Sequence, residues 1–372
     1  ELVCSNSFRS NDISNAVGLI KEEMACLDSL IVRAAYHARV PAGGALAVDR
    51  DKFSSFVTEA LMDLPNLTYV HDVITQIEKE GDGFSLACES GEKLSASRVV
   101  IATGPLTDDA LAKWILEQTN EEYLYFYDSI APIIEKDSID FKKSFYASRY
   151  DKGNANDYVN CAMNEDQYEA FMDAIESAEL AEVHEFDKAQ FFEGCLPLEE
   201  MVRRGRETAR FGPMKPVGLR DPADPETRHH AVVQLRQDNL HATLYNLVGF
   251  QTRMKWGDQK RIFRTIPGLE NAEFVRFGSM HRNTYLCSPK LLKQGLELKS
   301  MPGIHFAGQI TGCEGYVESA AMGLYVGRSL AKLVSGNELP PLPVTTAMGA
   351  LVNHILKADP SDYQPMNINW GL

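Results

Sequence analysis

The sequence has no run of about 18 apolar residues, so we expect no membrane-spanning helix. It has no C-x-x-C pair and no cysteine and histidine cluster at zinc-binding spacing, and its seven cysteines are scattered. We therefore predict no metal site and a reducing, cytoplasmic location. The chain also lacks an initiator methionine and a signal-peptide layout, because it begins at Glu1, so we expect an internal part of a longer protein.

An excess of basic residues is missing too. The formal net charge of −15 opposes non-specific nucleic-acid binding by the whole surface. Basic residues are nevertheless concentrated in two runs, six against one acid in residues 203–220 and five against one in residues 253–264. Either run alone is more typical of a solvated charged face. Two such runs on an acidic chain favour a phosphate-bearing partner.

Glycine-rich turns are the most informative feature present. Residues 305–323 (HFAGQITGCEGYVESAAMG) predict the end of a buried strand, a turn containing Gly308 and Gly312, and a helix that opens at Gly315. A helix N-terminus entered through glycines offers N–H groups and a positive dipole to an anionic or polarised group. The alternative is a strand-helix packing turn without a ligand, which is more common for an isolated glycine cluster.

A second motif precedes this one in the chain. Residues 50–61 predict a helix, and residues 67–77, 84–88 and 93–102 predict strands. The last strand runs into Thr103-Gly104, and an apolar strand that ends in A-T-G-P is frequent in flavoproteins with a dinucleotide-binding domain. Because open α/β sheets bind ligands at the carboxyl ends of their strands, we expect both motifs at one edge of one sheet.

The order of these segments predicts an α/β fold with a discontinuous first domain. We predict a Rossmann-like, flavoprotein dinucleotide-binding domain formed by residues 1–107 and 298–372, the second piece ending in a helix over residues 346–357. Residues 108–297 are compositionally different, with an aromatic-rich strand, an acidic helix over residues 165–179 and the two basic runs. We predict that they form an inserted α+β domain that binds substrate or RNA.

Two cysteines lie in surroundings that a buried structural thiol does not need. Cys195 follows Gly194 and precedes Pro197, a turn that can present a thiol at a cleft, and the basic run behind it favours the thiolate. Cys4 has the polar neighbours Ser5, Asn6, Ser7 and Arg9. From these residues alone, a structural role remains the more common one for each cysteine.

A dozen blocks are distributed along nearly the whole chain. In order, they are ELVCSNSFRSND, VPAGGALAVDR, ATGPLT, YLYFYD, SRYDKG, FFEGC, FGPMKPVGL, VVQLRQDN, VGFQT, PGLENAEFVR, MHRNTY and GQITGCEGYVESAAMG. Together they resemble the folate- and FAD-dependent tRNA (uracil-5-)-methyltransferase family. The resemblance implies an enzyme that forms 5-methyluridine in the T loop of tRNA, with carbon from methylenetetrahydrofolate and electrons from NADH or NADPH through FAD.

The resemblance also assigns roles to residues. Uracil C5 is a poor nucleophile until a thiolate adds to C6. Cys195 matches the proposed nucleophile and Cys4 the group that handles the C5 proton, with exchanged roles as the alternative. We expect cofactor contacts from Thr103, Gly104, Gly308, Gln309, Gly312, Glu314, Gly315, Tyr316 and Ser319. We expect RNA phosphate contacts from Arg203, Arg206 and Arg210, and folate or uridine contacts from Arg282 and Asn283, for which a role as polar loop residues is equally common.

The sequence departs from the family at its start. Family members begin with a strand, a G-x-G-x-x-G turn, a helix and a second strand ending in an acid, and this unit is not in the sequence. Its glycines carry the pyrophosphate and its acid binds the ribose, so we expect a dinucleotide domain that is incomplete at its N-terminus. Two alternatives stay open. One is an inactive RNA-binding fragment, which the missing unit favours, and the other is an enzyme with the same chemistry on a ribosomal RNA uridine. A related family that modifies the wobble uridine shares G-Q-x-x-G-x-x-G-Y but lacks the two cysteine blocks.

Overall fold

A computed structural model describes residues 2, 5–119, 124–154, 156–181 and 196–372. The chain forms two compact units, each assembled from separate stretches of sequence. The boundaries of these units differ from those of the predicted domain segments, residues 1–107, 108–297 and 298–372. The division into domains stays a prediction. The first unit contains Glu1–Ser10, Ala34–Phe56 and Phe126–His281, and the second contains Asn11–Arg33, Val57–Tyr125 and Arg282–Leu372.

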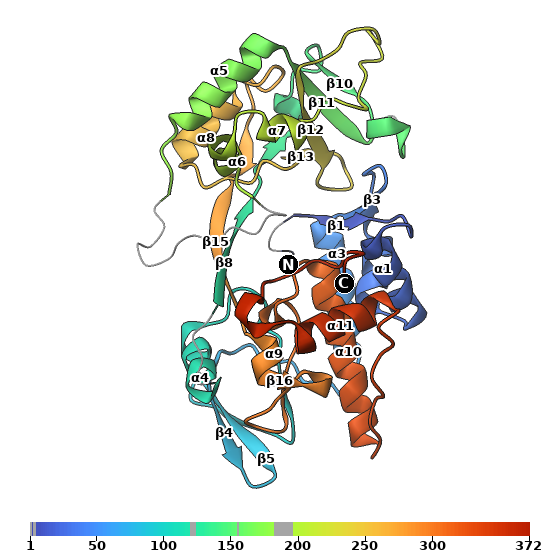
Figure 1. Ribbon diagram of the computed structural model, residues 1–372, viewed down its shortest axis with the longest axis vertical. Helices are drawn as coiled ribbons and strands as arrows, with labels where there is room; N and C mark the ends of the chain where they lie inside the picture. Colours follow the sequence, from blue (N-terminus) through green and yellow to red (C-terminus); the bar gives the residue numbers. More distant parts are fainter. Residues whose placement is uncertain (1, 3–4, 120–123, 155, 182–195) are drawn as a thin grey trace. The chain divides into compact units, whose positions relative to one another are not determined.

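A six-stranded antiparallel sheet organises the first unit (Figure 1). Its central strand β12 is buried along all seven residues, which shows that both of its faces are covered. The strand order is β10 (Ser144–Tyr146), β11 (Tyr158–Met163), β12 (Ala231–Gln237), β13 (Leu244–Leu247), β9 (Ile133–Glu135) and β14 (Phe274–Arg276).

Helices pack their apolar stripes on this sheet. In α5 (Glu165–Glu176) the buried residues Tyr168, Phe171, Met172 and Ile175 follow helical spacing. A capping box between Asn164 and Gln167 fixes where α5 begins. These side chains join one core cluster with residues of the sheet and of the neighbouring helices. The neighbouring helices are α6 (Leu198–Arg204), α7 (Thr208–Phe211) and α8 (Trp256–Phe263).

A smaller antiparallel sheet also belongs to the first unit. Its strand order is β1 (Ser7–Ser10), β3 (Ala45–Val48) and β2 (Arg39–Val40). Helix α2 (Leu30–His37) precedes β2 in the sequence and α3 (Arg50–Met62) follows β3, and both helices continue from one unit into the other. Strands β8 (Leu124–Ile130) and β15 (Ser279–Tyr285) also continue between units, and they pair with each other.

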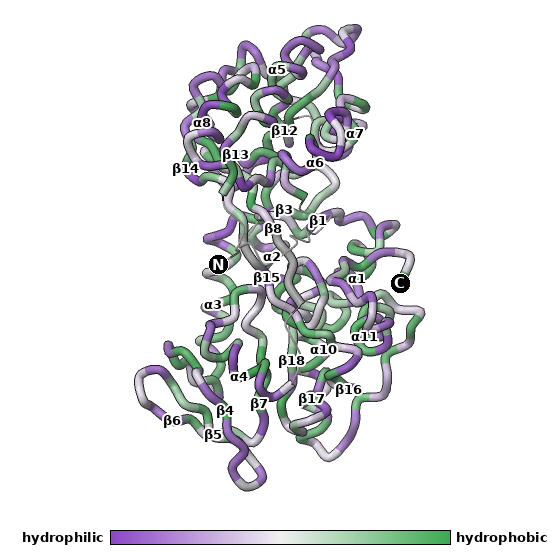
Figure 2. The backbone as a smooth tube through the Cα atoms, turned by 60° about the vertical axis from the view of Figure 1, so that its left-hand side comes forward, coloured by the Kyte–Doolittle hydropathy of each residue, from purple (hydrophilic) through white to green (hydrophobic). Residues whose placement is uncertain are grey.

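The second unit contains the predicted dinucleotide-type segments. Its four-stranded sheet has the order β16 (Leu292–Lys293), β17 (Glu297–Leu298), β18 (Ile304–Phe306) and β7 (Val99–Ile101). Strand β7 consists only of apolar residues, as expected for a strand in a parallel pair (Figure 2). The second sheet is β4 (Ile74–Glu80), β5 (Gly83–Cys88) and β6 (Lys93–Ala96), and the helices are α1 (Ala16–Cys26), α4 (Asp109–Thr119), α9 (Ser288–Leu291), α10 (Tyr316–Val334) and α11 (Ala347–Lys357).

Two predicted strands of this unit were wrong in extent. The predicted strand 67–77 begins only at Ile74. The predicted strand 93–102 is two strands, because β6 pairs with β5 whereas β7 pairs with β18 in the other sheet. Among the helices of the described part of the chain, none is long and apolar enough to cross a membrane.

Candidate functional site

Strands β7 and β18 bring the two glycine motifs together. They pair in parallel, with Ile304 opposite Val99 and Phe306 opposite Ile101. The pairing continues past the strands, because the Ala307 N–H donates to the Ile101 carbonyl oxygen at 3.0 Å. Both strands therefore end at the same edge of the sheet, β7 before Thr103-Gly104 and β18 before Gly308. This is the neighbourhood that the sequence predicts.

The turn after β18 depends on glycine. Gly308 and Gly315 have φ of 79° and 101°, a region that residues with a β-carbon rarely adopt. The Thr311 hydroxyl donates to the Gly308 carbonyl oxygen at 2.7 Å and holds the turn closed. Gly315 is the N-cap of α10, so this helix and its positive dipole end begin at the turn.

The nine predicted cofactor residues fall into a solvent-facing group and a buried group. Gly312 and Glu314 are buried, whereas the others are half-buried or exposed. A β-carbon at Gly312 would lie 2.6 Å from Cε1 of Tyr363, whose hydroxyl donates to the Thr311 carbonyl oxygen at 2.6 Å. Glu314 accepts a hydrogen bond from the Gln309 amide at 2.6 Å. Both buried residues thus support the turn, and cofactor contact by the nine remains a prediction.

The arginines predicted to contact RNA lie in or after α6, and each has an acidic partner. Arg203 is 74% exposed and binds Glu200 at 2.5 Å. Arg210 binds Glu207 at 2.7 Å. Arg206 binds three carboxylates of α5, those of Glu169, Asp173 and Glu176. Part of the positive charge of this run is therefore compensated within the fold.

The structure does not test the roles predicted for the two cysteines, Cys4 and Cys195, or for Arg282 and Asn283. Cys4 and Cys195 lie outside the described residues, so their predicted approach to one substrate stays a prediction. Asn283 is buried in β15, and the side chain of its neighbour Arg282 is outside the description.

Five other cysteines are described, and two of them have the features of inert thiols. Cys161 and Cys313 are fully buried, and burial raises the pKa of each thiol to about 12. A thiol with such a pKa stays protonated near neutral pH and is a poor nucleophile.

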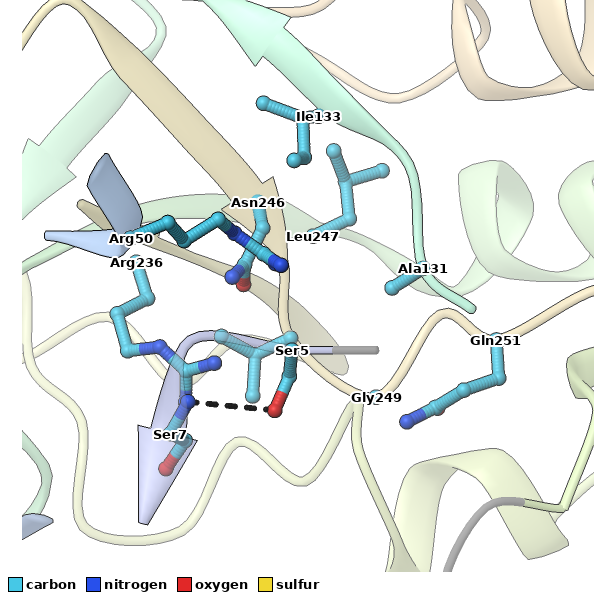
Figure 3. Close-up of a pocket in the computed structure, with 11 residues that line it drawn as sticks. Ser5, Ser7, Arg50, Ala131, Ile133, Arg236, Asn246, Leu247, Gly249 and Gln251 are labelled. Carbon is cyan, nitrogen blue, oxygen red and sulfur yellow. Dashed lines mark hydrogen bonds between the residues drawn. The ribbon is translucent and has the colours of Figure 1, made fainter. Parts of the chain in front are cut away.

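The first unit contains a pocket that was not predicted from the sequence. Its volume is about 240 Å³, and its residues come from five separate stretches of chain (Figure 3). Ser5 and Ser7 lie immediately after Cys4 in the sequence. The lining residues are Ser5, Ser7, Arg50, Ala131, Ile133, Arg236, Asn246, Leu247, Val248, Gly249 and Gln251.

A buried asparagine ties these stretches together. Asn6 has no exposed surface, and its amide donates to the carbonyl oxygens of Val48 at 3.0 Å and Gln237 at 3.2 Å. Its side-chain oxygen accepts from Nε of Arg236 at 3.2 Å and from the Asn246 amide at 3.3 Å. Asn6 thereby satisfies both of its polar atoms and fixes two lining residues.

Asp238 fixes the other arginine of the pocket. Its carboxylate, 4% exposed, accepts from Nε of Arg50 at 3.2 Å and from the Asn246 amide at 3.2 Å. Arg50 also donates to the Leu2 carbonyl oxygen at 2.8 Å. Seven of the eleven lining residues belong to the blocks ELVCSNS, VPAGGALAVDR, VVQLRQDN and VGFQT, which the sequence alone did not link to each other. The other four, Ala131, Ile133, Asn246 and Leu247, lie outside these blocks.

Comparison with known proteins identifies the family. The family model described as "Glucose inhibited division protein A" matches residues 1–338. The methylenetetrahydrofolate-tRNA-(uracil-5-)-methyltransferases TrmFO of Brevibacillus brevis and Bacillus cytotoxicus are each 55% identical over 372 residues, all of this chain and 81% of each relative. The chain belongs to this methyltransferase family. The family resemblance deduced from the sequence is therefore confirmed.

Solved structures confirm the fold class of this methyltransferase family member. Aquifex aeolicus GidA in two crystal forms gives TM-scores of 0.73 and 0.72 at 15% identity. The alignments cover 97% and 98% of this chain, and 63% and 66% of the GidA chains. The chain thus spans less than two thirds of GidA, and the likeness shows the fold alone. It supports the predicted α/β class with a Rossmann-like dinucleotide-binding domain.

Two glycines of the second unit, Gly312 and Gly323, are expected to differ in how strongly their replacement by alanine lowers stability. We expect Gly312→Ala to lower the free energy of unfolding by about 2 kcal/mol or more, because the new methyl group meets Tyr363 and the backbone there has φ of 85°. The control is Gly323→Ala in α10, where an added β-carbon meets no atom within 4 Å and helix propensity favours alanine. Urea unfolding curves in which the two variants shift equally would show that Gly312 is not required by packing.

Proposed function

We propose that this chain methylates C5 of a uridine in tRNA, with methylenetetrahydrofolate as the carbon donor and FAD as the redox cofactor. The observation that carries the proposal is 55% identity across the whole chain with a protein named for this reaction. The relatives' names specify tRNA, which favours tRNA over the ribosomal RNA alternative. A uridine of the T loop is the finer form of the proposal, and NADH or NADPH is the proposed source of electrons.

The edge of the parallel strand pair has the properties that a flavin dinucleotide needs. A β-carbon added at Gly104 meets no atom within 4 Å, so the backbone there is open to a flat ligand. Gly308 and Gly315 expose backbone at the start of α10. We assign the binding of FAD to these glycines with Thr103, Gln309, Tyr316 and Ser319. When bound, FAD supplies the electrons that reduce the transferred carbon to a methyl group.

The two cysteines outside the described residues carry the proposed chemistry at uracil. A Cys195 thiolate adds to C6 and moves electron density to C5, which then attacks the methylene carbon of the folate. Cys4 removes the C5 proton as the folate nitrogen leaves that carbon, and reduction of the carbon to a methyl group accompanies loss of the thiolate from C6, which restores the ring. The exchanged assignment requires the same two steps with the residues reversed. Arg282 and Asn283 are the proposed folate or uridine contacts.

The thiolate step is tested with tRNA in which uridine is replaced by 5-fluorouridine. The fluorine at C5 cannot be removed as a proton, so the bond between sulfur and C6 persists. With methylenetetrahydrofolate present, we expect the full chain to form a protein-RNA complex that survives a denaturing gel, and Cys195→Ala to form none. Cys4→Ala should retain the complex, as should the control Cys26→Ala, which removes an exposed thiol.

The outcomes separate the assignments. Loss of the complex in Cys4→Ala and retention in Cys195→Ala would exchange the two roles. A complex that persists in both single variants and in the double variant would refute catalysis by these thiols.

Arg203 is the most exposed of the three arginines proposed to contact RNA phosphate, at 74% against 34% for Arg206 and 30% for Arg210. We expect Arg203→Ala to reduce the slope of log affinity for tRNA against log salt concentration by about one unit, as for one lost phosphate contact. The control is Lys143→Ala, which removes a cation 52% exposed and paired with Glu270, outside the basic runs. A slope that is unchanged in Arg203→Ala, or reduced equally in both variants, would show that Arg203 belongs to an ordinary solvated face.

A further inference from the structure

We propose that the pocket lined by Arg50 and Arg236 binds an anionic oxygen group of a substrate, a carboxylate or a phosphate. The proposal rests on the proposed function only for the source of this group, because a folate carries carboxylates and tRNA carries phosphates. The binding of an anion itself follows from the charge, the geometry and the size of the pocket.

The charge of the pocket favours an anion. Among the eleven described residues that line it, two are arginines and none is acidic. Arg236 is 8% exposed, and the side chain of Arg50 is 17% exposed. Asp238 lies next to the pocket and forms an ion pair with Arg50 at 3.2 Å. An anion that enters the pocket therefore meets two guanidinium groups and no lining carboxylate, so the charge of the lining attracts it.

The guanidinium groups are held in place before any ligand arrives. Nε of Arg236 is fixed by Asn6 at 3.2 Å, and Nε of Arg50 is fixed by Asp238 at 3.2 Å. Figure 3 shows both guanidinium groups among the side chains that surround the pocket. A guanidinium group matches the planar oxygens of a carboxylate or phosphate with paired N–H donors. Rigid donors of this kind lose little conformational entropy on binding.

Neutral donors complete the lining. The Ser5 hydroxyl accepts from the Ser7 N–H at 3.3 Å, and the Ser7 hydroxyl accepts from the Arg9 N–H at 3.1 Å. A hydroxyl that accepts a hydrogen bond keeps its own proton to donate. Both serines can therefore donate to the same anionic group as the arginines.

The size of the pocket limits what it holds. Its volume of about 240 Å³ is below the range of roughly 300 to 1,000 Å³ that is typical of sites for whole small molecules. The pocket therefore fits one charged group of a larger substrate, and the rest of that substrate lies elsewhere.

The first measurement uses inorganic phosphate as the probe. We expect phosphate to raise the unfolding temperature of the full chain above that in chloride at equal ionic strength, because a ligand that binds only the folded state stabilises it. Arg236→Met should lose this rise, and Arg236→Lys should bind phosphate about tenfold more weakly, because lysine lacks the paired donors. If Arg236→Met does not fold, Arg236→Lys and Arg50→Lys carry the test.

Arg149 supplies the matched control. Like Arg50, it is half-buried in the first unit; it donates to the Val217 carbonyl oxygen and to the Gln234 side chain, and it does not line the pocket. We expect Arg149→Lys and Arg149→Met to keep the full response to phosphate. A wild-type chain that responds to phosphate no more than to chloride, or Arg236 variants that respond like the wild type, would overturn the proposal.

The second measurement identifies the source. Affinities of the full chain for tetrahydrofolate, for a pterin without the glutamate, and for unmodified tRNA are compared in the wild type and Arg236→Lys. Weaker binding of tetrahydrofolate but not of the pterin assigns the pocket to a folate carboxylate. Weaker tRNA binding with a smaller salt slope assigns it to an RNA phosphate. Unchanged affinity for all three would overturn the substrate role. Because none of these measurements requires methylation, failure of the pocket and failure of the proposed function are distinguishable.

Discussion

The parallel pairing of β7 with β18 is the constraint on which the candidate cofactor site depends. The paired residues are about 200 positions apart, so the pairing closes a long loop whose entropy cost must be offset by burial of both strands. Ile304 and Phe306 have no exposed surface, and Val99 and Ile101 are also buried. One register of these short strands places both glycine turns at one edge. A slip by one residue would turn these side chains to the opposite face.

In the first unit, buried polar side chains connect stretches of chain that are distant in the sequence. Asn6, Asp238 and Asn246 are buried, and the hydrogen bonds among them and the two arginines satisfy groups that would otherwise be costly to remove from water. Such a network specifies the positions of its members more sharply than apolar packing does. The same interactions that stabilise this part of the unit therefore also fix the shape and charge of the pocket.

Local patterns in the sequence were sufficient for several elements. The local sequence predicted α3 and a helix over residues 165–179, which covers all of α5 but ends three residues too late, and the glycine pattern predicted that Gly315 opens α10. Spacing along one segment does not show when a strand leaves one sheet for another, which is why residues 93–102 were predicted as a single strand. The sheet to which a strand belongs depends on partner strands that are distant in the sequence. The periodicity of one segment contains no information about those partners.

The candidate site shows the same limit. The glycine motifs were predicted because each is compact in sequence, whereas Asn6 and Asn246 are 240 positions apart and neither has a local pattern. Likewise, a basic run does not reveal that Arg206 is bound by three acids of α5. Only the family resemblance singled out the blocks that contain Ser5, Arg50 and Arg236, and it did so without placing these residues together.

The central claim is that this chain transfers a carbon from folate to a uridine of tRNA. The most direct measurement incubates the full chain with FAD, NADPH, unmodified tRNA and methylenetetrahydrofolate labelled with ¹³C in the methylene group, followed by mass spectrometry of the digested RNA. The account predicts labelled 5-methyluridine in tRNA and none in ribosomal RNA treated in parallel. Label in ribosomal RNA alone, or no label from a chain that has bound FAD, would contradict it.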